Sequence, residues 1–132
     1  MTGVQTCALP ISGFDAKNNV GFTTTARDLA RFGVLILNNG DWNGQTIVKD
    51  KQFLHDALHP SQELNPSYGY LWWLNRGAAA KPQLPASAFS ALGAGSNVIW
   101  CDPDRDLVAV LRWINKAAVD GFLLRLVAAL RD

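Results

Sequence analysis

The sequence predicts an α+β fold in which an antiparallel sheet of three to four strands is flanked by helices. Apolar residues between Ala26 and Leu37 recur at helical spacing, and a second amphipathic stretch runs from Val119 to Leu130. Between them, strand-forming residues from Val98 to Trp113 are interrupted by Asp102-Pro103-Asp104-Arg105, which has the composition of a tight turn. Consecutive strands joined by short turns pair antiparallel, and helices on either side of them in sequence can cover their faces.

Length and composition restrict the class of protein. The chain has 132 residues, 12 Lys and Arg against 11 Asp and Glu, and a net charge of +1. This length allows one domain at most. The composition, with 48% hydrophobic and 17% charged residues, indicates a packed chain rather than a disordered one. The balanced charge argues against nucleic-acid binding. No apolar run reaches the roughly 18 residues of a membrane span, and we expect no cofactor.

The first eleven residues are interpreted separately from the rest. Thr2 to Ile11 resembles the conceptual translation of a short-read sequencing adapter, and it has no basic region typical of a signal peptide. We therefore expect residues 1–11 to be an artefact without a fold and residues 12–132 to be the genuine chain, entered partway along its reading frame. A natural flexible N-terminus is the alternative. Without Cys7, Cys101 is the single cysteine and no internal disulfide forms.

The helix expected over Ala26–Leu37 has signals at both ends. Thr25 can cap its N-terminus, and Asp28, at the third helical position, can reach back to that cap. Asn38-Asn39-Gly40 is typical of a helix C-terminus, because Asn and Gly accept the left-handed backbone conformation.

Shorter segments follow this helix. Residues 41–44 predict a turn, residues 45–48 a short extended piece, and residues 50–58 a second helix that Pro60 stops. Residues 61–67 predict a loop.

The next segments predict the first strands. Tyr68 to Leu74 alternates with apolar residues on both faces, which indicates a strand covered on both sides. Residues 76–85 are rich in Ala, Pro and Gly and predict a surface connection. Residues 88–93 resume an extended structure and lead into the 98–113 hairpin.

Several reactive or aromatic residues have simple structural explanations. His55 and His59 lie at i and i+4 on one helix face, a spacing that can chelate zinc, but no third ligand is evident and we expect no metal site. Cys101 lies in an apolar strand pattern and is expected to be a buried apolar side chain. Most tryptophans are expected to pack in the core, although a Trp-rich sheet could also bind a glycan or peptide. The five are Trp42, Trp72, Trp73, Trp100 and Trp113.

The glycine-rich segment Gly93-Ala94-Gly95-Ser96-Asn97 lies between two expected strands. No helix follows it and no Lys accompanies it, which argues against a phosphate-binding loop. Glycines at such a place allow close approach of a ligand or of another backbone segment. A backbone N–H beside a cleft can supply half of an oxyanion hole.

Three segments together resemble the serine β-lactamase-related hydrolases, which include class C β-lactamases, DD-peptidases, esterases and amide-oligomer hydrolases. Residues 21–44, beginning Gly-Phe-Thr-Thr-Thr-Ala-Arg-Asp-Leu-Ala-Arg-Phe-Gly, resemble a helix and turn of that family. Tyr68-Gly69-Tyr70-Leu71-Trp72-Trp73 resembles the strand that follows. Residues 89–108 are similar to its catalytic-edge strand and next hairpin. The resemblance covers residues 13–132 and implies the C-terminal part of the β-lactamase/transpeptidase-like fold, incomplete as it stands.

The resemblance implies an acyl-serine mechanism. In the family, the serine of Ser-x-x-Lys attacks a carbonyl, while that Lys and the Tyr of Tyr-x-Asn move the proton. A third motif, Lys-Thr-Gly or His-x-Gly, binds substrate, and the N–H of the residue after its Gly joins the oxyanion hole. Ala91, Leu92 and Gly93 stand at this third motif and are implied to bind substrate. The Ala94 backbone N–H is implied to be the oxyanion donor.

The sequence departs from the family pattern twice. Neither Ala91 nor Leu92 is a cation, which favours an esterase- or amidase-like member over efficient penicillin recognition. Ser-x-x-Lys and Tyr-x-Asn do not occur in the chain. We therefore expect a C-terminal fragment of a hydrolase of small-molecule esters or amides, inactive alone and marginally stable. A Trp-rich binding module is the alternative. Because relatives occur as exported and as cytoplasmic proteins, the resemblance assigns no compartment.

Overall fold

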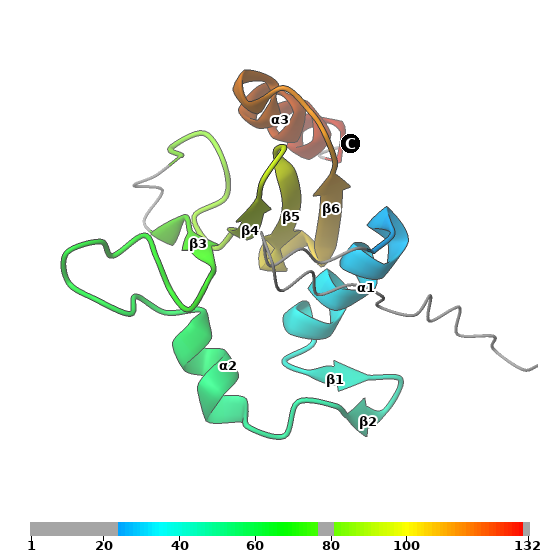
Figure 1. Cartoon of the computed structure of the whole chain (residues 1–132), viewed down its shortest axis with the longest axis vertical. Coiled ribbons are helices and arrows are strands. Elements are labelled where there is room, and N and C mark those ends of the chain that lie inside the picture. The colour runs from blue at the N-terminus through cyan, green and yellow to red at the C-terminus, as the bar shows by residue number, and fades with distance from the viewer. Residues whose placement is uncertain (1–23, 77–80, 131–132) are drawn as a thin grey trace, which may run out of the picture.

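The computed structural model describes residues 24–76 and 81–130, and within them it has the α+β architecture that the sequence predicts (Figure 1). The expectations for residues 1–23 lie outside the described residues. The elements, in chain order, are α1 (Ala26–Leu37), β1 (Asp41–Trp42), β2 (Gln45–Thr46), α2 (Lys51–Ala57), β3 (Trp73–Leu74), β4 (Phe89–Gly93), β5 (Asn97–Asp102), β6 (Leu107–Leu111) and α3 (Val119–Ala129). Short 3-10 turns at Pro103–Arg105 and Lys116–Ala118 precede β6 and α3.

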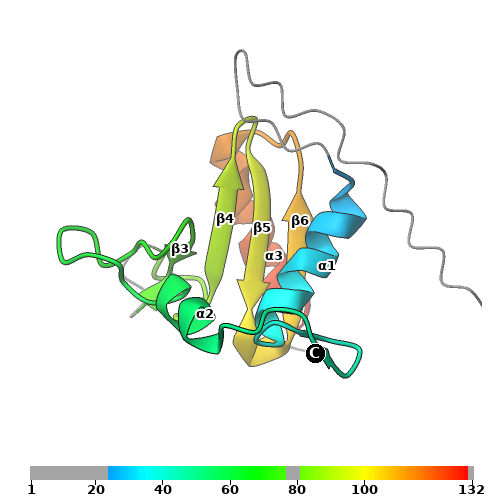
Figure 2. The same ribbon diagram turned by 60° about the horizontal axis from the view of Figure 1, so that its bottom comes forward.

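The central sheet has the order β3-β4-β5-β6, with every neighbouring pair antiparallel. It separates two cores, with α1 on one face and α3 on the other (Figure 2). Successive side chains of a strand point to opposite faces, so β5 contributes to both cores. Ile99 and Cys101 pack in the core that includes α1 and α2, whereas Val98 and Trp100 pack against α3.

Helix α1 begins and ends where its sequence predicts. The Thr25 hydroxyl accepts the Asp28 backbone N–H at 3.1 Å and donates to the Asp28 carboxylate at 2.6 Å. At the other end, Asn39 and Gly40 take left-handed conformations with φ of 52° and 79°. The chain then reverses into the β1–β2 hairpin, and Asp50 caps α2 by accepting the Phe53 backbone N–H.

The β5–β6 hairpin is also confirmed. Asp102 is fully buried, accepts the Asp104 backbone N–H at 3.1 Å and forms an ion pair with Arg105 at 2.8 Å. Pro103 opens the 3-10 turn, and Asp106 completes the reversal in a left-handed conformation with φ of 49°.

The strand expected over Tyr68–Leu74 is wrong for most of its length. Only Trp73 and Leu74 form β3, and residues 68–73 instead make a tight reversal in which the Gly69 N–H donates to the Trp72 carbonyl. A Cβ on Gly69 would lie 2.1 Å from the Ala57 carbonyl oxygen, so close contact with the end of α2 imposes the reversal. Leu71 takes a positive φ of 64° at its tip. Contact with a distant element outweighs the alternating pattern.

The connection expected on the surface over residues 76–85 is partly internal. Leu84 is buried, and the side chain of buried Asn75 organises the loop. Its Nδ2 donates to the carbonyls of Lys81, Leu84 and Pro85 at 2.8–3.1 Å, and its Oδ1 accepts the Lys81 N–H. A single polar side chain therefore substitutes for strand hydrogen bonds here. Residues 77–80 lie outside the described residues.

Candidate functional site

The residues that the resemblance places at the third family motif lie on β4 and in the turn after it. β4 is bordered by β5 on one side and by β3 opposite Phe89 and Ser90 on the other. The Asn75 N–H donates to the Ala88 carbonyl at 2.9 Å, and backbone groups alternate between the two edges. The backbone of Leu92 therefore faces the same edge as Ala88, beyond the point where β3 ends. No other described strand covers this part of β4.

The motif positions differ in their surroundings. Ala91 packs against the core shared by α1 and α2, whereas Leu92 is 54% exposed on the opposite face. Gly93 and Ala94 are exposed at the end of the strand. Gly95 and Ser96 then take left-handed conformations with φ of 73° and 54°, which returns the chain into β5.

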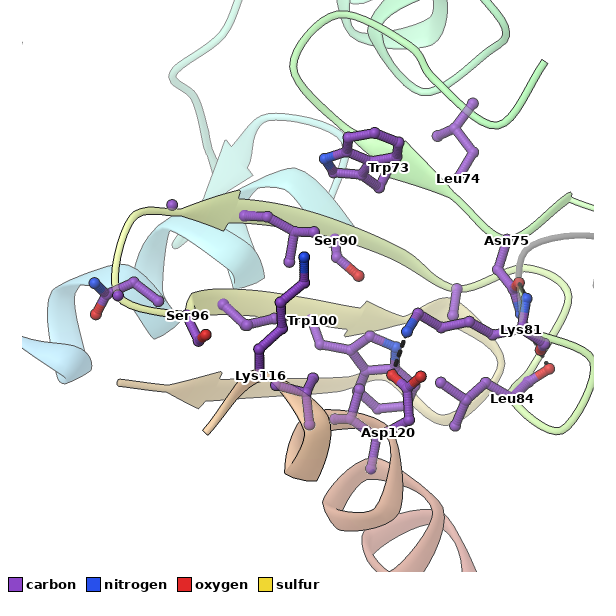
Figure 3. A pocket seen from close by; sticks show the side chains of 18 residues that line it. Trp73, Leu74, Asn75, Lys81, Leu84, Ser90, Ser96, Trp100, Lys116 and Asp120 are labelled. Atoms are coloured by element: carbon purple, nitrogen blue, oxygen red, sulfur yellow. Dashed lines mark hydrogen bonds and ion pairs between the residues drawn. The ribbon is translucent and has the colours of Figure 1, made fainter. Parts of the chain in front are cut away.

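A cavity of about 510 Å³ lies between this end of β4 and helix α3 (Figure 3). Its apolar lining includes Leu84, Trp100 and Leu123. Leu92 and Gly93 also line it, but Ala91 and Ala94 do not. The structure thus brings two of the four predicted site residues to the cavity and leaves the Ala94 turn at its border.

Lys116 is a charged residue at the cavity that the sequence analysis missed. Two other charged lining residues, Lys81 and Asp120, form an ion pair with each other, whereas Lys116 pairs with no acidic side chain among the described residues. Its side chain extends across the cavity toward Ser90 in Figure 3. No local sequence pattern indicates a role for Lys116. It follows β6 in the chain, and only the fold brings it to the cavity beside β4.

Ser90 and Ser96 are the hydroxyl side chains of the cavity. In the described part of the chain, neither hydroxyl forms a hydrogen bond with a lysine, histidine or carboxylate. A serine needs such a base to become a nucleophile at neutral pH. Ser87 Oγ donates to the Asp104 carboxylate at 2.7 Å, but this exposed pair lies outside the cavity. The cavity therefore supplies backbone donors and a binding surface, and neither of its serines is activated.

The other reactive side chains are accounted for structurally. The His55 and His59 rings stack with centroids 3.7 Å apart, and His59 Nδ1 lies 2.5 Å from the His55 carbonyl. Residues 24–76 and 81–130 hold no cluster of three metal-ligating side chains. Cys101 is fully buried, and this burial raises the pKa of its thiol to about 12, far from nucleophilic thiolate chemistry.

The tryptophans divide into two groups. Trp72 and Trp100 are buried, whereas Trp42, Trp73 and Trp113 are more than a third exposed. The exposed three lie on β1, on β3 and after β6, so the expectation that most tryptophans pack in the core is wrong. None of the described helices is long and apolar enough to cross a membrane.

Comparison with known proteins agrees with this arrangement. The family model described as Beta-lactamase matches residues 6–129. A comparison with curated proteins returned no match. A match over nearly the whole chain, together with the α1 helix, the antiparallel sheet and the C-terminal helix α3, shows that the chain belongs to the beta-lactamase family.

Proposed function

We propose that residues 12–132 are the C-terminal portion of a serine hydrolase that cleaves ester or amide bonds through an acyl-serine intermediate. In this proposal the nucleophile and its base come from an upstream portion of the same domain. The observation that carries the proposal is the uncovered end of β4, where the Ala94 turn borders a cavity in a beta-lactamase family chain. The chain itself contains neither Ser-x-x-Lys nor Tyr-x-Asn.

In the proposed reaction, the serine oxygen attacks the substrate carbonyl carbon, and the carbonyl oxygen gains a negative charge. The Ala94 N–H donates to that oxygen together with the N–H of the serine, which stabilises the charge as it forms. The tetrahedral intermediate collapses to an acyl-serine and releases an alcohol or amine. Water then hydrolyses the acyl-serine. The largely apolar cavity beside Leu92 would hold the part of the substrate that does not react.

The absence of a cation at Ala91 and Leu92 favours ester or amide substrates over penicillins. Lys116 supplies a positive charge in the cavity, but it approaches from the α3 side, on the face opposite Ala91. We expect Lys116 to attract an anionic substituent of the substrate. We do not expect it to take the place of the Lys or His of the family's third motif.

The first experiment tests the chain alone. A fluorophosphonate probe should not label the purified 132-residue protein, because neither serine of the cavity is hydrogen-bonded to a base, and the exposed pair of Ser87 and Asp104 lies outside the cavity. Serine-specific labelling, mapped by mass spectrometry, would overturn the prediction that the chain is inactive.

The second experiment tests the complete domain. The reading frame upstream of Ser12 is recovered from the source DNA, and the longer protein is assayed with p-nitrophenyl esters, anilides and a chromogenic cephalosporin. We expect hydrolysis of esters or anilides. In that protein, Ala94→Pro removes the oxyanion N–H and should lower kcat by about 10²–10³-fold. Ala94→Ser keeps the N–H and is the matched control. Equal activity in both variants would contradict the oxyanion role.

The alternative function, a Trp-rich module for glycans or peptides, predicts a different result in the same protein. It requires saturable binding of an oligosaccharide or peptide, followed by tryptophan fluorescence, with no hydrolysis of any ester or amide. Trp73 is the residue to monitor, because it is 44% exposed and lines the cavity.

A further inference from the structure

We propose that Asn97 and Arg112 are positioning residues for the turn that carries the Ala94 N–H. Arg112 orients the side-chain amide of Asn97, and Asn97 holds the Ala94 carbonyl. Together they set the peptide groups at the uncovered end of β4. The inference rests on the proposed role of Ala94 and adds two residues that the family motif does not include.

Asn97 makes the contact with the turn. It is the first residue of β5 and the register partner of Gly93. Its Nδ2 donates to the Ala94 carbonyl at 2.5 Å, so the side chain at the end of the turn bonds the backbone at its start. The peptide group after Ala94 is therefore fixed by a side chain rather than by a strand partner.

Arg112 determines which way the Asn97 amide faces. Arg112 Nε donates to Asn97 Oδ1 at 3.2 Å. A guanidinium has donors and no acceptor, so the amide oxygen must face Arg112 and the amide nitrogen must face Ala94. Without Arg112, the amide of Asn97 is free to rotate and can present its oxygen to the Ala94 carbonyl, which would repel it.

Arg112 is itself held from a third element. Its Nη1 donates to the Thr24 carbonyl at 2.6 Å, just before the residue that caps α1. One planar guanidinium therefore joins the start of α1, the end of β6 and the Ala94 turn. A lysine has a single ammonium group at its tip and cannot reproduce this forked geometry.

The next residue, Trp113, contacts the same turn. A Cβ on Gly95 would lie 2.2 Å from Trp113 Cζ3, so the backbone of Gly95 lies directly against the indole ring. Asn97 and Arg112 thus restrain the turn at Ala94, and Trp113 limits its movement at Gly95.

The test measures the turn directly in the full 132-residue chain by NMR with ¹⁵N and ¹³C labelling. Asn97→Ala should shift the Ala94 carbonyl ¹³C resonance and increase Gly95 amide exchange by about fivefold or more, because the peptide loses its restraint. Arg112→Lys should move the Asn97 side-chain NH₂ resonances toward values for a free amide. Asn65→Ala is the matched control, since the Asn65 side chain also bonds the backbone in a remote loop, where its Oδ1 accepts the Ser67 N–H. Unchanged Ala94 and Gly95 signals in Asn97→Ala, or equal changes in Asn65→Ala, would overturn the inference.

A second arm separates this inference from the proposed function. In the longer, serine-containing protein, Asn97→Ala should lower kcat by about tenfold with a smaller effect on KM, as expected for a misplaced transition-state donor. If Ala94→Pro has no effect on kcat, the proposed function fails. The NMR experiment still tests the restraint of the turn, because it does not depend on activity. If Ala94→Pro lowers kcat and Asn97→Ala does not, the positioning role is wrong.

Discussion

Asp102 and Cys101 lie next to each other on β5, and both side chains are fully buried. The two differ in how they tolerate burial. The Asp102 side chain is paired with Arg105 and accepts a backbone N–H, whereas the Cys101 thiol lies in an apolar core. Burying a charge without a partner is costly, so the turn after β5 must place Arg105 correctly.

The burial of Cys101 leads to a prediction about reactivity. In a Cys7→Ser variant, iodoacetamide at pH 8 should modify Cys101 only when the chain unfolds, because the thiol is inaccessible and its pKa is raised from 9.0 to about 12. Its contribution to stability is complete below about pH 9 and is lost as pH rises toward about 12, since only the unfolded chain ionises there. Native labelling as fast as labelling in urea would contradict this.

Leu71 is a strained residue with an exposed side chain. Its φ is 64°, so its backbone conformation is unfavourable for a residue with a Cβ. Its side chain is 80% exposed, so it buries little apolar surface in compensation. Leu71→Asn should raise the free energy of unfolding by about 0.5–1 kcal/mol, because Asn tolerates the left-handed conformation better. Leu64→Asn is the control, since Leu64 is 92% exposed but has no positive φ. Urea titrations followed by tryptophan fluorescence measure both; a gain at Leu64 alone would refute the explanation.

At the scale of elements, α1 connects the sequence signals to the sheet. Its cap is local, formed by Thr25 and Asp28, whereas its position depends on a close approach to β5 and β6 at Gly33. The first feature can be changed without the second. The helix therefore offers separate tests of local and tertiary stabilisation.

The cap predicts a pH effect. The hydrogen bond from Thr25, and secondly that from Arg31, lowers the pKa of Asp28 below 3.8. The contribution of this carboxylate to stability is present above about pH 4 and is lost as pH falls through the lowered pKa. Thr25→Ala should reduce the free energy of unfolding at pH 7 by about 1 kcal/mol and let the Asp28 pKa rise. Thr25→Ser should preserve both. NMR titration of the Asp28 carboxyl carbon reports the pKa, and an unchanged value in Thr25→Ala contradicts the cap.

Gly33 predicts the cost of crowding between α1 and the sheet. A Cβ on Gly33 would lie 2.6 Å from Val108 Cγ1, so Gly33→Ala should lower stability by about 1–3 kcal/mol despite the better helix propensity of Ala. Adding Val108→Ala should recover part of the loss. Gly121→Ala in α3 is the control, because a Cβ there meets nothing within 4 Å and should stabilise by up to about 1 kcal/mol. A stabilising Gly33→Ala would show that the two elements are not packed this closely.

At the scale of the whole molecule, aromatic side chains remain exposed where α1, α2 and the 68–74 segment meet. Phe32 stacks on Trp72 and Phe53 contacts Tyr70, yet Phe32, Phe53 and Tyr70 are each 45–52% exposed. The upstream portion of the domain, as proposed above, would cover this exposed aromatic surface, which supports the proposed function.

This exposure predicts binding of a hydrophobic dye. The 132-residue chain should increase anilinonaphthalene sulfonate fluorescence, and Phe32→Ser with Phe53→Ser should reduce the signal by about half or more, since the dye binds exposed apolar surface. Ile47→Ser is the control, because Ile47 is 52% exposed just after β2 and takes part in neither aromatic pair. In the longer protein the dye signal should fall to that of a typical folded protein. A strong signal there would argue against an intact domain.

Much of the fold could be predicted because its signals are local. The cap at Thr25, the Asn-Gly end of α1 and the Asp-Pro turn after β5 each depend on a few neighbouring residues, and the structure confirms all three. The strand at 68–74 could not be predicted, because contact between Gly69 and the end of α2 decides it. The roles of Ala91, Leu92, Gly93 and Ala94 stay predictions.

The sequence by itself predicted α1, α2, the β5–β6 hairpin and α3, because periodicity, caps and turn residues act over a few positions, and three of its segments carried the resemblance to the family. Only the tertiary structure placed Lys116 and Leu92 in the lining of one cavity and joined Arg112 to Asn97 and Thr24. Those groups are far apart in sequence and meet because the sheet brings the ends of β4, β5 and β6 together. The physical reason is that backbone conformation over a few residues depends on those residues and their neighbours, whereas side-chain contacts between elements depend on how the elements pack.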